Sequence, residues 1–141
     1  MAGKSCFRGA AGPPHVERNL DGWTTGYTNE RIRFTPDSGE SIQSSCDYAT
    51  AGCANVTASV VQLSTPRPGA SHYVELGFTS GAGSIAAGHD SGEVHLRFNK
   101  SNWSNFDETN DYSFDATKTA FTSWDRMTVF RGGVLVWGTE P

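Results

Sequence analysis

With 141 residues, the chain is long enough for one domain with one hydrophobic core and too short for two. Its formal net charge is -4 at pH 7, and no segment concentrates Lys and Arg. A nucleic-acid partner or an anionic membrane surface is therefore disfavoured, because neutralising phosphates requires a basic surface. No apolar run reaches about 18 residues, so we also expect no membrane span.

The composition favours an all-β fold. Charged residues make up only 18% of the chain, and 16 glycines occur among many Ser, Thr and Asn, a mixture typical of short strands and turns. Several β-rich runs with no helical periodicity between them predict an antiparallel β-sandwich. In chain order these runs are Val56 to Leu63, His72 to Phe78, Glu93 to Phe98, Arg126 to Phe130 and Val134 to Gly138.

The first part of the chain differs from the rest. Residues 1–26 show no clear period and contain the breaker cluster GAAGPP, so we treat residues 1–29 as an atypical N-terminal segment and residues 30–141 as the sandwich module. This segment also lacks the apolar stretch of about 7 to 15 residues found in a secretory signal. If the protein is exported, we expect its signal to lie outside this chain.

Alternation assigns faces to the strands that follow. The even positions from Val94 to Phe98 are apolar and should face the core, which turns Glu93, His95 and Arg97 outward together. Val74, Leu76 and Phe78 should likewise share one face of their strand. Near the C-terminus, the pair Gly132-Gly133 satisfies a two-residue turn with positive φ at both positions, and so predicts a hairpin between the last two strands.

The four tryptophans have different surroundings. Trp103 stands among Asn, Ser and Asp in a polar loop, which indicates either a ligand platform or an anchor that folds back over the sandwich edge. Trp124 precedes a predicted strand and Trp137 lies within an apolar one, so we expect both in the core. The sequence around Trp23 does not place it.

Three cysteines occur, at positions 6, 46 and 53. Cys46 and Cys53 bracket a short Ala/Gly-rich stretch that could close into a disulfide loop in an oxidising compartment. The alternative is a pair of small buried thiols. Cys6 is left over in either case.

A second polar cluster is acidic. Asp107, Asn110 and Asp111 supply oxygen atoms within five residues, and Thr35 with Asp37 could add more. Hard oxygen ligands suit calcium rather than zinc. The spacing does not match an EF-hand, and the alternative is a solvated loop with Asx turns.

Several motifs in order resemble the family 3 carbohydrate-binding modules of bacterial cellulases and cellulosomal scaffolds. They are CDYA at Cys46, SGAGSIAAG, NWSNFDETNDYSF and the closing segment Met127 to Pro141, and the resemblance covers about Thr35 to Pro141. It implies a nine-stranded jelly-roll sandwich, one structural calcium, and adsorption to cellulose without catalysis. The five calcium ligands it implies are Thr35, Asp37, Asp107, Asn110 and Asp111.

The resemblance also implies a planar cellulose-binding strip. The matching positions are Asp47, Tyr48, Arg97 and Trp103, with secondary anchors at His95 and Tyr112 opposite the strip. The family often has a further aromatic residue after the CDYA-like motif, whereas the loop TAGCANV of this chain has none. We therefore expect a strip that is shorter by one stacking residue.

Three other functions remain as alternatives. The module could assist a hydrolase by presenting single glucan chains, or it could be a calcium-stabilised structural or adhesive sandwich without a sugar ligand. A small glycoside hydrolase would need two facing carboxylates, one of them with a raised pKa, and no acidic residue here lies in an apolar stretch. For the leading interpretation we expect a secreted, extracellular protein, with the module fused to a glycoside hydrolase or a scaffold.

Overall fold

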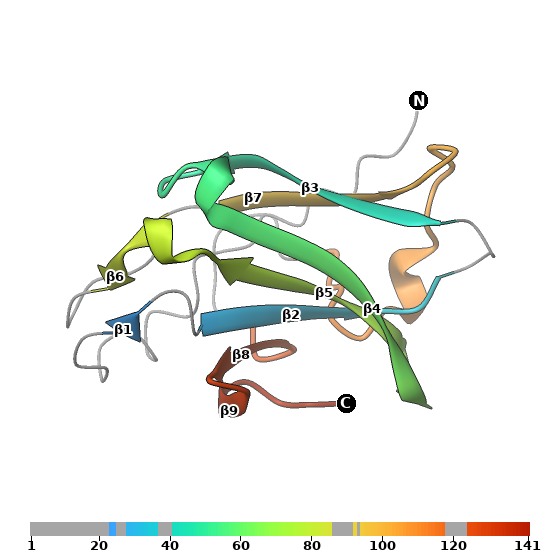
Figure 1. The fold of residues 1–141 in the computed structure, drawn as a ribbon. Coiled ribbons are helices and arrows are strands. Elements are labelled where there is room, and N and C mark those ends of the chain that lie inside the picture. The colour runs from blue at the N-terminus through green and yellow to red at the C-terminus, as the bar shows by residue number, and fades with distance from the viewer. Residues whose placement is uncertain (1–22, 25–27, 37–40, 86–91, 93, 118–123) are drawn as a thin grey trace.

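Antiparallel strands in two main layers form the body of the molecule (Figure 1). The structure is a computed structural model that describes residues 23–24, 28–36, 41–85, 92, 94–117 and 124–141. The described strands are β1 (Trp23–Thr24), β2 (Thr28–Phe34), β3 (Ile42–Ala49), β4 (Val56–Arg67), β5 (Ala70–Phe78), β6 (Ser84–Ile85), β7 (Val94–Lys100), β8 (Met127–Arg131) and β9 (Val134–Trp137). Within the same ranges lie three short 3-10 helices, η2 (Cys53–Asn55), η3 (Ser80–Ala82) and η4 (Glu108–Asn110).

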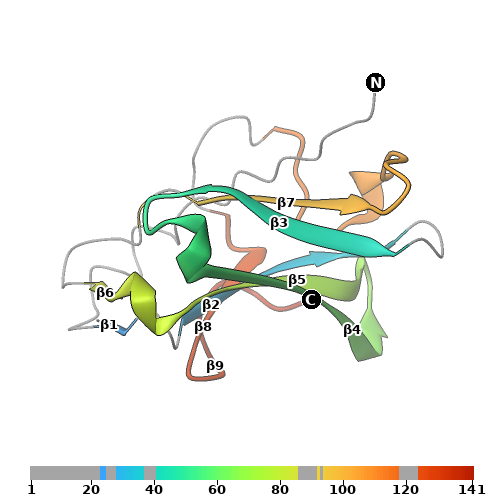
Figure 2. The same ribbon diagram turned by 45° about the horizontal axis from the view of Figure 1, so that its top comes forward.

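The strands form one large sheet and two small ones. The large sheet has the order β4-β5-β2-β8-β9, while β3 pairs with β7 and β1 pairs with β6. Every pairing is antiparallel. Figures 1 and 2 show the β3–β7 pair lying over β4, β5 and β2 as a second layer. The predicted all-β antiparallel sandwich is therefore confirmed, and no helix in the described ranges is long and apolar enough to cross a membrane.

The core lies between these two layers. Ile32, Phe34, Val74 and Leu76 face it from the large sheet, and the even positions from Val94 to Phe98 face it from β7. The Phe34 and Phe98 ring centroids are 5.0 Å apart, a separation suited to a favourable aromatic contact. The inward and outward faces predicted from alternation in β5 and β7 are thus confirmed, except that Glu93 lies outside the described residues.

Strand limits differ from the prediction in several places. β3 is a complete strand that the sequence did not reveal, because most of its side chains are polar and its pattern does not alternate. β4 continues through Pro66 to Arg67, which the edge position of this strand in the sheet allows, since proline cannot donate a ladder hydrogen bond in a central strand. β2 begins at Thr28, two residues before the limit at residue 30.

The C-terminal hairpin forms as expected, but its tryptophan is not buried in the core as predicted. Gly132 and Gly133 have φ values of 55° and 81°, and β8 pairs with β9 across them. However, β9 is the edge of the large sheet, Val134 is 65% exposed, and Trp137 is only half-buried. Trp124 is half-buried too, and its indole Nε1 donates a hydrogen bond to the Ser113 carbonyl at 2.9 Å. The prediction that both tryptophans belong to the core is wrong, because an edge strand and a polar indole both favour the surface.

Candidate functional site

A β-bulge in β3 turns two consecutive side chains outward. The register runs from Cys46 opposite Leu96 to Tyr48 opposite His95, so Asp47 has no residue opposite it. Without the extra residue, alternation would send Tyr48 inward. The bulge instead leaves Asp47 and Tyr48 both exposed on the outer face of the β3–β7 pair, before the chain re-enters the core at Ala49.

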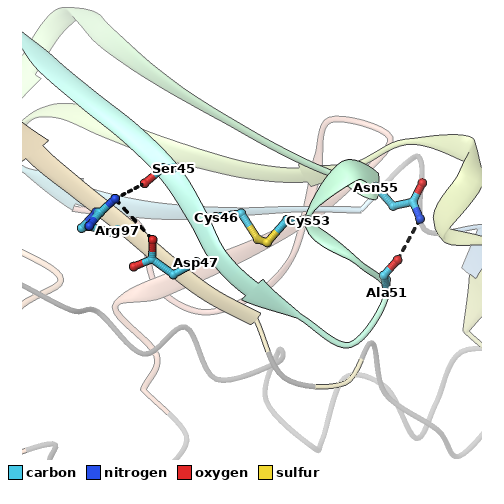
Figure 3. The surroundings of a disulfide bond; sticks show 7 residues. All are labelled: Ser45, Cys46, Asp47, Ala51, Cys53, Asn55 and Arg97. Carbon is cyan, nitrogen blue, oxygen red and sulfur yellow. Dashed lines mark hydrogen bonds and ion pairs between the residues drawn. A yellow bond between two sulfur atoms is a disulfide. The ribbon is translucent and has the colours of Figure 1, made fainter.

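Arg97 connects the two strands on this outer face (Figure 3). Its Nη2 donates to the Ser45 hydroxyl at 3.1 Å and lies 3.3 Å from the Asp47 carboxylate. Its guanidinium carbon is 5.4 Å from the ring centroid of Trp103, within the range of a cation–π contact. Because the Asp47 and Arg97 side chains are 41% and 25% exposed, we assign this ion pair an orienting role rather than a large share of the stability.

Tyr48 and His95 form a second contact on the same face. The two residues are opposite each other in the β3–β7 register, and their ring centroids are 5.3 Å apart with the planes tilted by 54°. His95 therefore lies beside the predicted strip rather than opposite it, because it shares a face with Arg97 two residues later in the same strand. The expectation that His95 is an anchor opposite the strip is therefore corrected.

Trp103 stands on the loop after β7 with its side chain 47% exposed. Its φ of 60° is the one positive value of a non-glycine residue in the described part of the chain. Its backbone N–H donates to the Lys100 carbonyl at 2.9 Å, which closes a tight turn directly after the strand. A left-handed conformation costs a bulky residue about 1 to 2 kcal/mol, so surrounding contacts must hold it in place.

We call this set of outward side chains the β3–β7 strip. Its members are Asp47, Tyr48, His95, Arg97 and Trp103. The strip combines three flat rings, which can stack on the C–H faces of a ligand, with a charged pair that can exchange hydrogen bonds with hydroxyl groups. The loop that follows β3 folds into η2 and carries no aromatic residue, so the missing stacking residue is not replaced from that loop.

A disulfide fixes the strand immediately before the bulge. Cys46 and Cys53 are bonded at 2.05 Å, which joins β3 to η2 seven residues later (Figure 3). Asn55 braces the same turn, because its side-chain amide donates to the Ala51 carbonyl at 2.8 Å. Of the two possibilities that the sequence left open, a disulfide or a pair of buried thiols, the structure has the disulfide. Cys6 lies outside the described residues.

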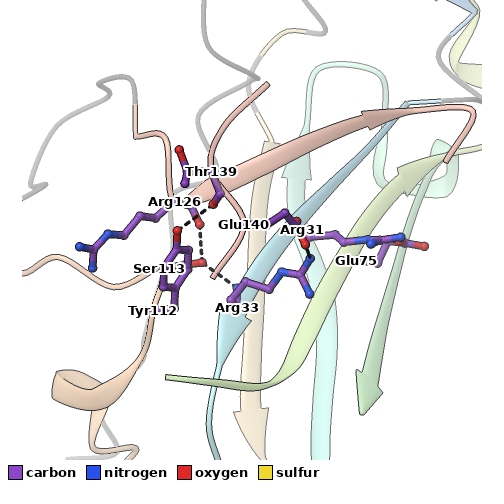
Figure 4. Close-up of polar contacts among 8 residues, drawn as sticks. All are labelled: Arg31, Arg33, Glu75, Tyr112, Ser113, Arg126, Thr139 and Glu140. Carbon is purple, nitrogen blue, oxygen red and sulfur yellow. Dashed lines mark hydrogen bonds and ion pairs between the residues drawn. The ribbon is translucent and has the colours of Figure 1, made fainter. Parts of the chain in front are cut away.

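Tyr112 contacts the C-terminal segment (Figure 4). Its hydroxyl donates to the Thr139 carbonyl at 2.8 Å, and its backbone N–H donates to Gly69 in the turn between β4 and β5. Burial raises the pKa of this phenol above its ordinary value, which favours the protonated form that donates this hydrogen bond. Its described contacts serve to attach the C-terminal segment to the sandwich.

The outer face of the large sheet carries a separate polar network, also shown in Figure 4. Arg33 is only 2% exposed, and its Nη2 contacts both carboxylate oxygens of Glu140 at 2.6 and 2.7 Å. Arg31 contacts Glu75 at 2.8 Å and lies 4.6 Å from the Tyr73 ring centroid. The Arg33–Glu140 pair supplies the buried cation with a counter-charge, as the interior of a fold requires, and it ties the C-terminal segment to β2. The Arg31–Glu75 pair joins β2 to β5.

Two of the five predicted calcium positions are in direct contact. The Thr35 backbone N–H donates to Asp111 Oδ1 at 2.7 Å, and the Asp111 carboxylate is only 6% exposed. Asn110 immediately precedes it at the end of η4, where its carbonyl lies 2.7 Å from the position that a Cβ on Gly69 would occupy. Only glycine therefore allows the β4–β5 turn to approach this loop so closely.

The remaining two calcium positions are less closely connected to this pair. Asp37 lies outside the described residues. Asp107 caps η4, where hydrogen bonds from the hydroxyl and the backbone N–H of Thr109 hold the pKa of its carboxyl below the ordinary value. The donor set consists of oxygens, as calcium prefers, but within the described ranges no three His, Cys, Asp or Glu side chains form a group that could hold a metal.

Comparison with known proteins identifies the family. The profile of the cellulose binding domain, the family 3 carbohydrate-binding modules, matches residues 18–138. The chain belongs to this family. Endoglucanase A of Paenibacillus lautus is 49% identical over 111 residues, which are 79% of this chain but only 16% of the length of that enzyme.

Solved structures of family 3 modules share the fold of this one. The CBM3b of the scaffoldin subunit ScaA from Acetivibrio cellulolyticus has a TM-score of 0.81 and 36% identity, over 86% of this chain and 78% of that one. A biomass sensing module from putative Rsgi-like proteins of Clostridium thermocellum has a TM-score of 0.80 and 34% identity, over 85% and 79% of the two chains. The jelly-roll sandwich expected for a family 3 module is confirmed.

Two residues that shape the strip of this family 3 module escaped the sequence analysis. Ser45 accepts a hydrogen bond from Arg97, but a lone serine in a polar run gave no signal. Lys100 is only 4% exposed at the base of the Trp103 loop. Its position could have been found, because the inward alternation of β7 continues through Phe98 to residue 100.

Proposed function

We propose that this chain is a non-catalytic module that adsorbs to cellulose through the β3–β7 strip. The observation that carries the proposal is the pairing of two half-exposed rings, Trp103 and Tyr48, with the Arg97–Asp47 ion pair on one face. A glucan chain presents flat C–H faces that pack on aromatic rings, and edge hydroxyl groups that bond to carboxylate and guanidinium. The family of the chain supports the same ligand.

The expected affinity of a single site is modest. Covering one face of each ring contributes about 1 to 2 kcal/mol, and two rings with one polar pair give about 3 to 6 kcal/mol after the costs of binding. That range corresponds to dissociation constants from millimolar to tens of micromolar. Useful adsorption would therefore depend on attachment to a parent protein, which raises the effective concentration at the surface.

The proposal includes a parent protein that is secreted. This chain matches a small part of endoglucanase A and most of a module from a scaffoldin. Both likenesses support fusion to a glycoside hydrolase or a scaffold that works on extracellular polysaccharide. The proposal assigns no catalysis to the module itself, because the family model that matches it describes a binding domain, whereas a hydrolase needs two facing carboxyl groups, one of them with a raised pKa.

Adsorption of the isolated chain tests the proposal. The protein should leave the supernatant when mixed with microcrystalline cellulose and should return when soluble cello-oligosaccharide competes at millimolar concentration. Chitin of similar particle size is the control surface. Equal depletion by both powders, or none by cellulose, would contradict cellulose recognition, and release of reducing sugar from amorphous cellulose would contradict the non-catalytic role.

We also propose that the module holds one structural calcium ion. Thr35, Asp107, Asn110 and Asp111 would hold it together with Asp37, and the ion would neutralise the buried Asp111 carboxylate while joining η4 to the end of β2. Free calcium at ten times its dissociation constant should stabilise the fold by about 1.4 kcal/mol. A calcium chelator should accordingly lower the melting temperature by roughly 5 °C.

The control for this measurement is to add calcium back to the chelated protein. Calcium added in excess over the chelator should restore the melting temperature, whereas magnesium should not, because it requires a smaller and more rigid coordination shell. An Asp111→Asn variant should lose the response to calcium. An identical melting curve with and without chelator would show that the acidic loop is stable without a metal.

A further inference from the structure

Lys100 is a buried cation directly beneath the strip. It is the last residue of β7, it faces inward, and it is only 4% exposed. Its ammonium donates to the Asn105 carbonyl at 2.7 Å and lies 5.1 Å from the ring centroid of Phe106. A buried ammonium is unfavourable unless such partners receive it. These contacts help to compensate for the loss of hydration of the ammonium at this core position.

The same residue closes both ends of the loop that carries Trp103. Its carbonyl accepts the Trp103 backbone N–H at 2.9 Å, and its ammonium holds the Asn105 carbonyl on the other side of the indole. Phe106 then returns to the core, with its ring centroid 5.5 Å from that of Phe98. Trp103 thus stands on a short excursion whose start and end are both bonded to Lys100.

The backbone at Trp103 needs such a constraint. With φ at 60°, the residue occupies a conformation that a bulky side chain leaves readily unless the surrounding contacts prevent it. In that conformation the indole lies over the Arg97 guanidinium, 5.4 Å from ring centroid to guanidinium carbon. A loop released at Asn105 could relax to an ordinary backbone conformation, and the indole would then leave Arg97.

We propose that Lys100 is a positioning residue that holds Trp103 in the plane of the strip. Its importance for adsorption rests on the proposed cellulose-binding function, whereas its effect on the loop does not. The alternative is that Lys100 serves only the stability of the core. The two roles differ in one respect: a positioning role acts through Trp103 and disappears when Trp103 is absent.

A double-mutant cycle separates the two roles. Lys100→Met keeps the unbranched side chain and removes the donor, and Lys100→Arg retains a cation. We expect Lys100→Met to weaken adsorption to microcrystalline cellulose about tenfold in the wild-type background and less than twofold in the Trp103→Ala background. Lys100→Arg should recover most of the loss. Val74→Ala, a core change on β5, should lower the melting temperature and leave adsorption unchanged.

Hydrogen exchange at the Trp103 backbone amide provides a readout that needs no ligand. Lys100→Met should accelerate this exchange about tenfold or more, relative to amides within β5 of the same variant. If the wild type does not adsorb while the exchange accelerates, cellulose binding is wrong and the positioning role stands. Unchanged exchange at Trp103, or an equal loss of adsorption with and without Trp103, would overturn the positioning role.

Discussion

Replacing Trp103 and Arg97 together with alanine should reduce adsorption to microcrystalline cellulose by about a hundredfold. Trp103→Ala removes a stacking face that contributes about 1 to 2 kcal/mol. Arg97→Ala removes the cation that orients both the Asp47 carboxylate and the indole, at 3.3 and 5.4 Å respectively. Depletion isotherms for the wild type, both single variants and the double variant give the affinity changes, and thermal unfolding shows whether each variant is folded.

The chain offers a closely matched control for this experiment. Arg126 lies 5.5 Å from the ring of Trp124, a pair of the same residue types at almost the same separation as Arg97 and Trp103. This pair lies outside the β3–β7 strip, and the Trp124 indole donates to the Ser113 carbonyl. The Arg126→Ala, Trp124→Ala variant should therefore adsorb like the wild type. Equal losses in both double variants would mean that adsorption does not depend on the strip.

The two single variants should not be additive. Because Arg97 and Trp103 contact each other, removing either one already disturbs the contribution of the other. We expect the sum of the two single losses in binding free energy to exceed the loss in the double variant. Additive losses would indicate that the two side chains contact the ligand independently, with no role for the contact between them.

The parts of the fold that were predictable are those that local sequence determines. Alternation in β7 assigned both faces of the strand correctly, since each side chain is positioned by its own backbone. The hairpin at Gly132 and Gly133 was predictable for a similar reason, because positive φ at two adjacent positions is required by the turn itself. Both features follow from a few neighbouring residues.

The parts that were not predictable depend on partners distant in the chain. β3 is polar, and its bulge exists only in relation to β7, so no local pattern could show that Asp47 and Tyr48 face the same way. Their place in the strip was inferred from resemblance alone. Trp137 was misplaced because its apolar strand gives no sign of being an edge strand, a property set by the strand order of the whole sheet.

The residues of the candidate site also divide into those that local sequence predicts and those that depend on distant partners. Arg97 and His95 were found from alternation and Trp103 from its polar surroundings, yet the contact of His95 with Tyr48 required the register between two strands. Lys100 was missed because an inward-facing lysine conflicts with the usual expectation that lysines are exposed. Its partners, Asn105 and Phe106, show why the exception occurs here. The strongest departures from local rules thus lie at the base of the proposed binding surface.

Removing the disulfide should have the largest effect on stability among the changes near the strip. Cys46 and Cys53 close a loop of seven residues' separation, and the chain-entropy relation assigns such a link about 2.4 kcal/mol of stabilisation. The Cys46→Ser, Cys53→Ser variant should therefore melt roughly 8 °C below the wild type. Adsorption should weaken as well, because Cys46 immediately precedes the bulge that turns Asp47 and Tyr48 outward.

Reduction of the wild type provides an independent form of the same test. A dithiol reagent should lower the melting temperature of the wild type by a similar amount and should not affect the double-serine variant. Ala54→Ser places a hydroxyl group in the same 3-10 helix without removing the link, and should match the wild type in both measurements. If reduction lowers the stability but leaves adsorption intact, the bulge is held by the β3–β7 hydrogen bonds alone, and the disulfide stabilises the fold without positioning the strip.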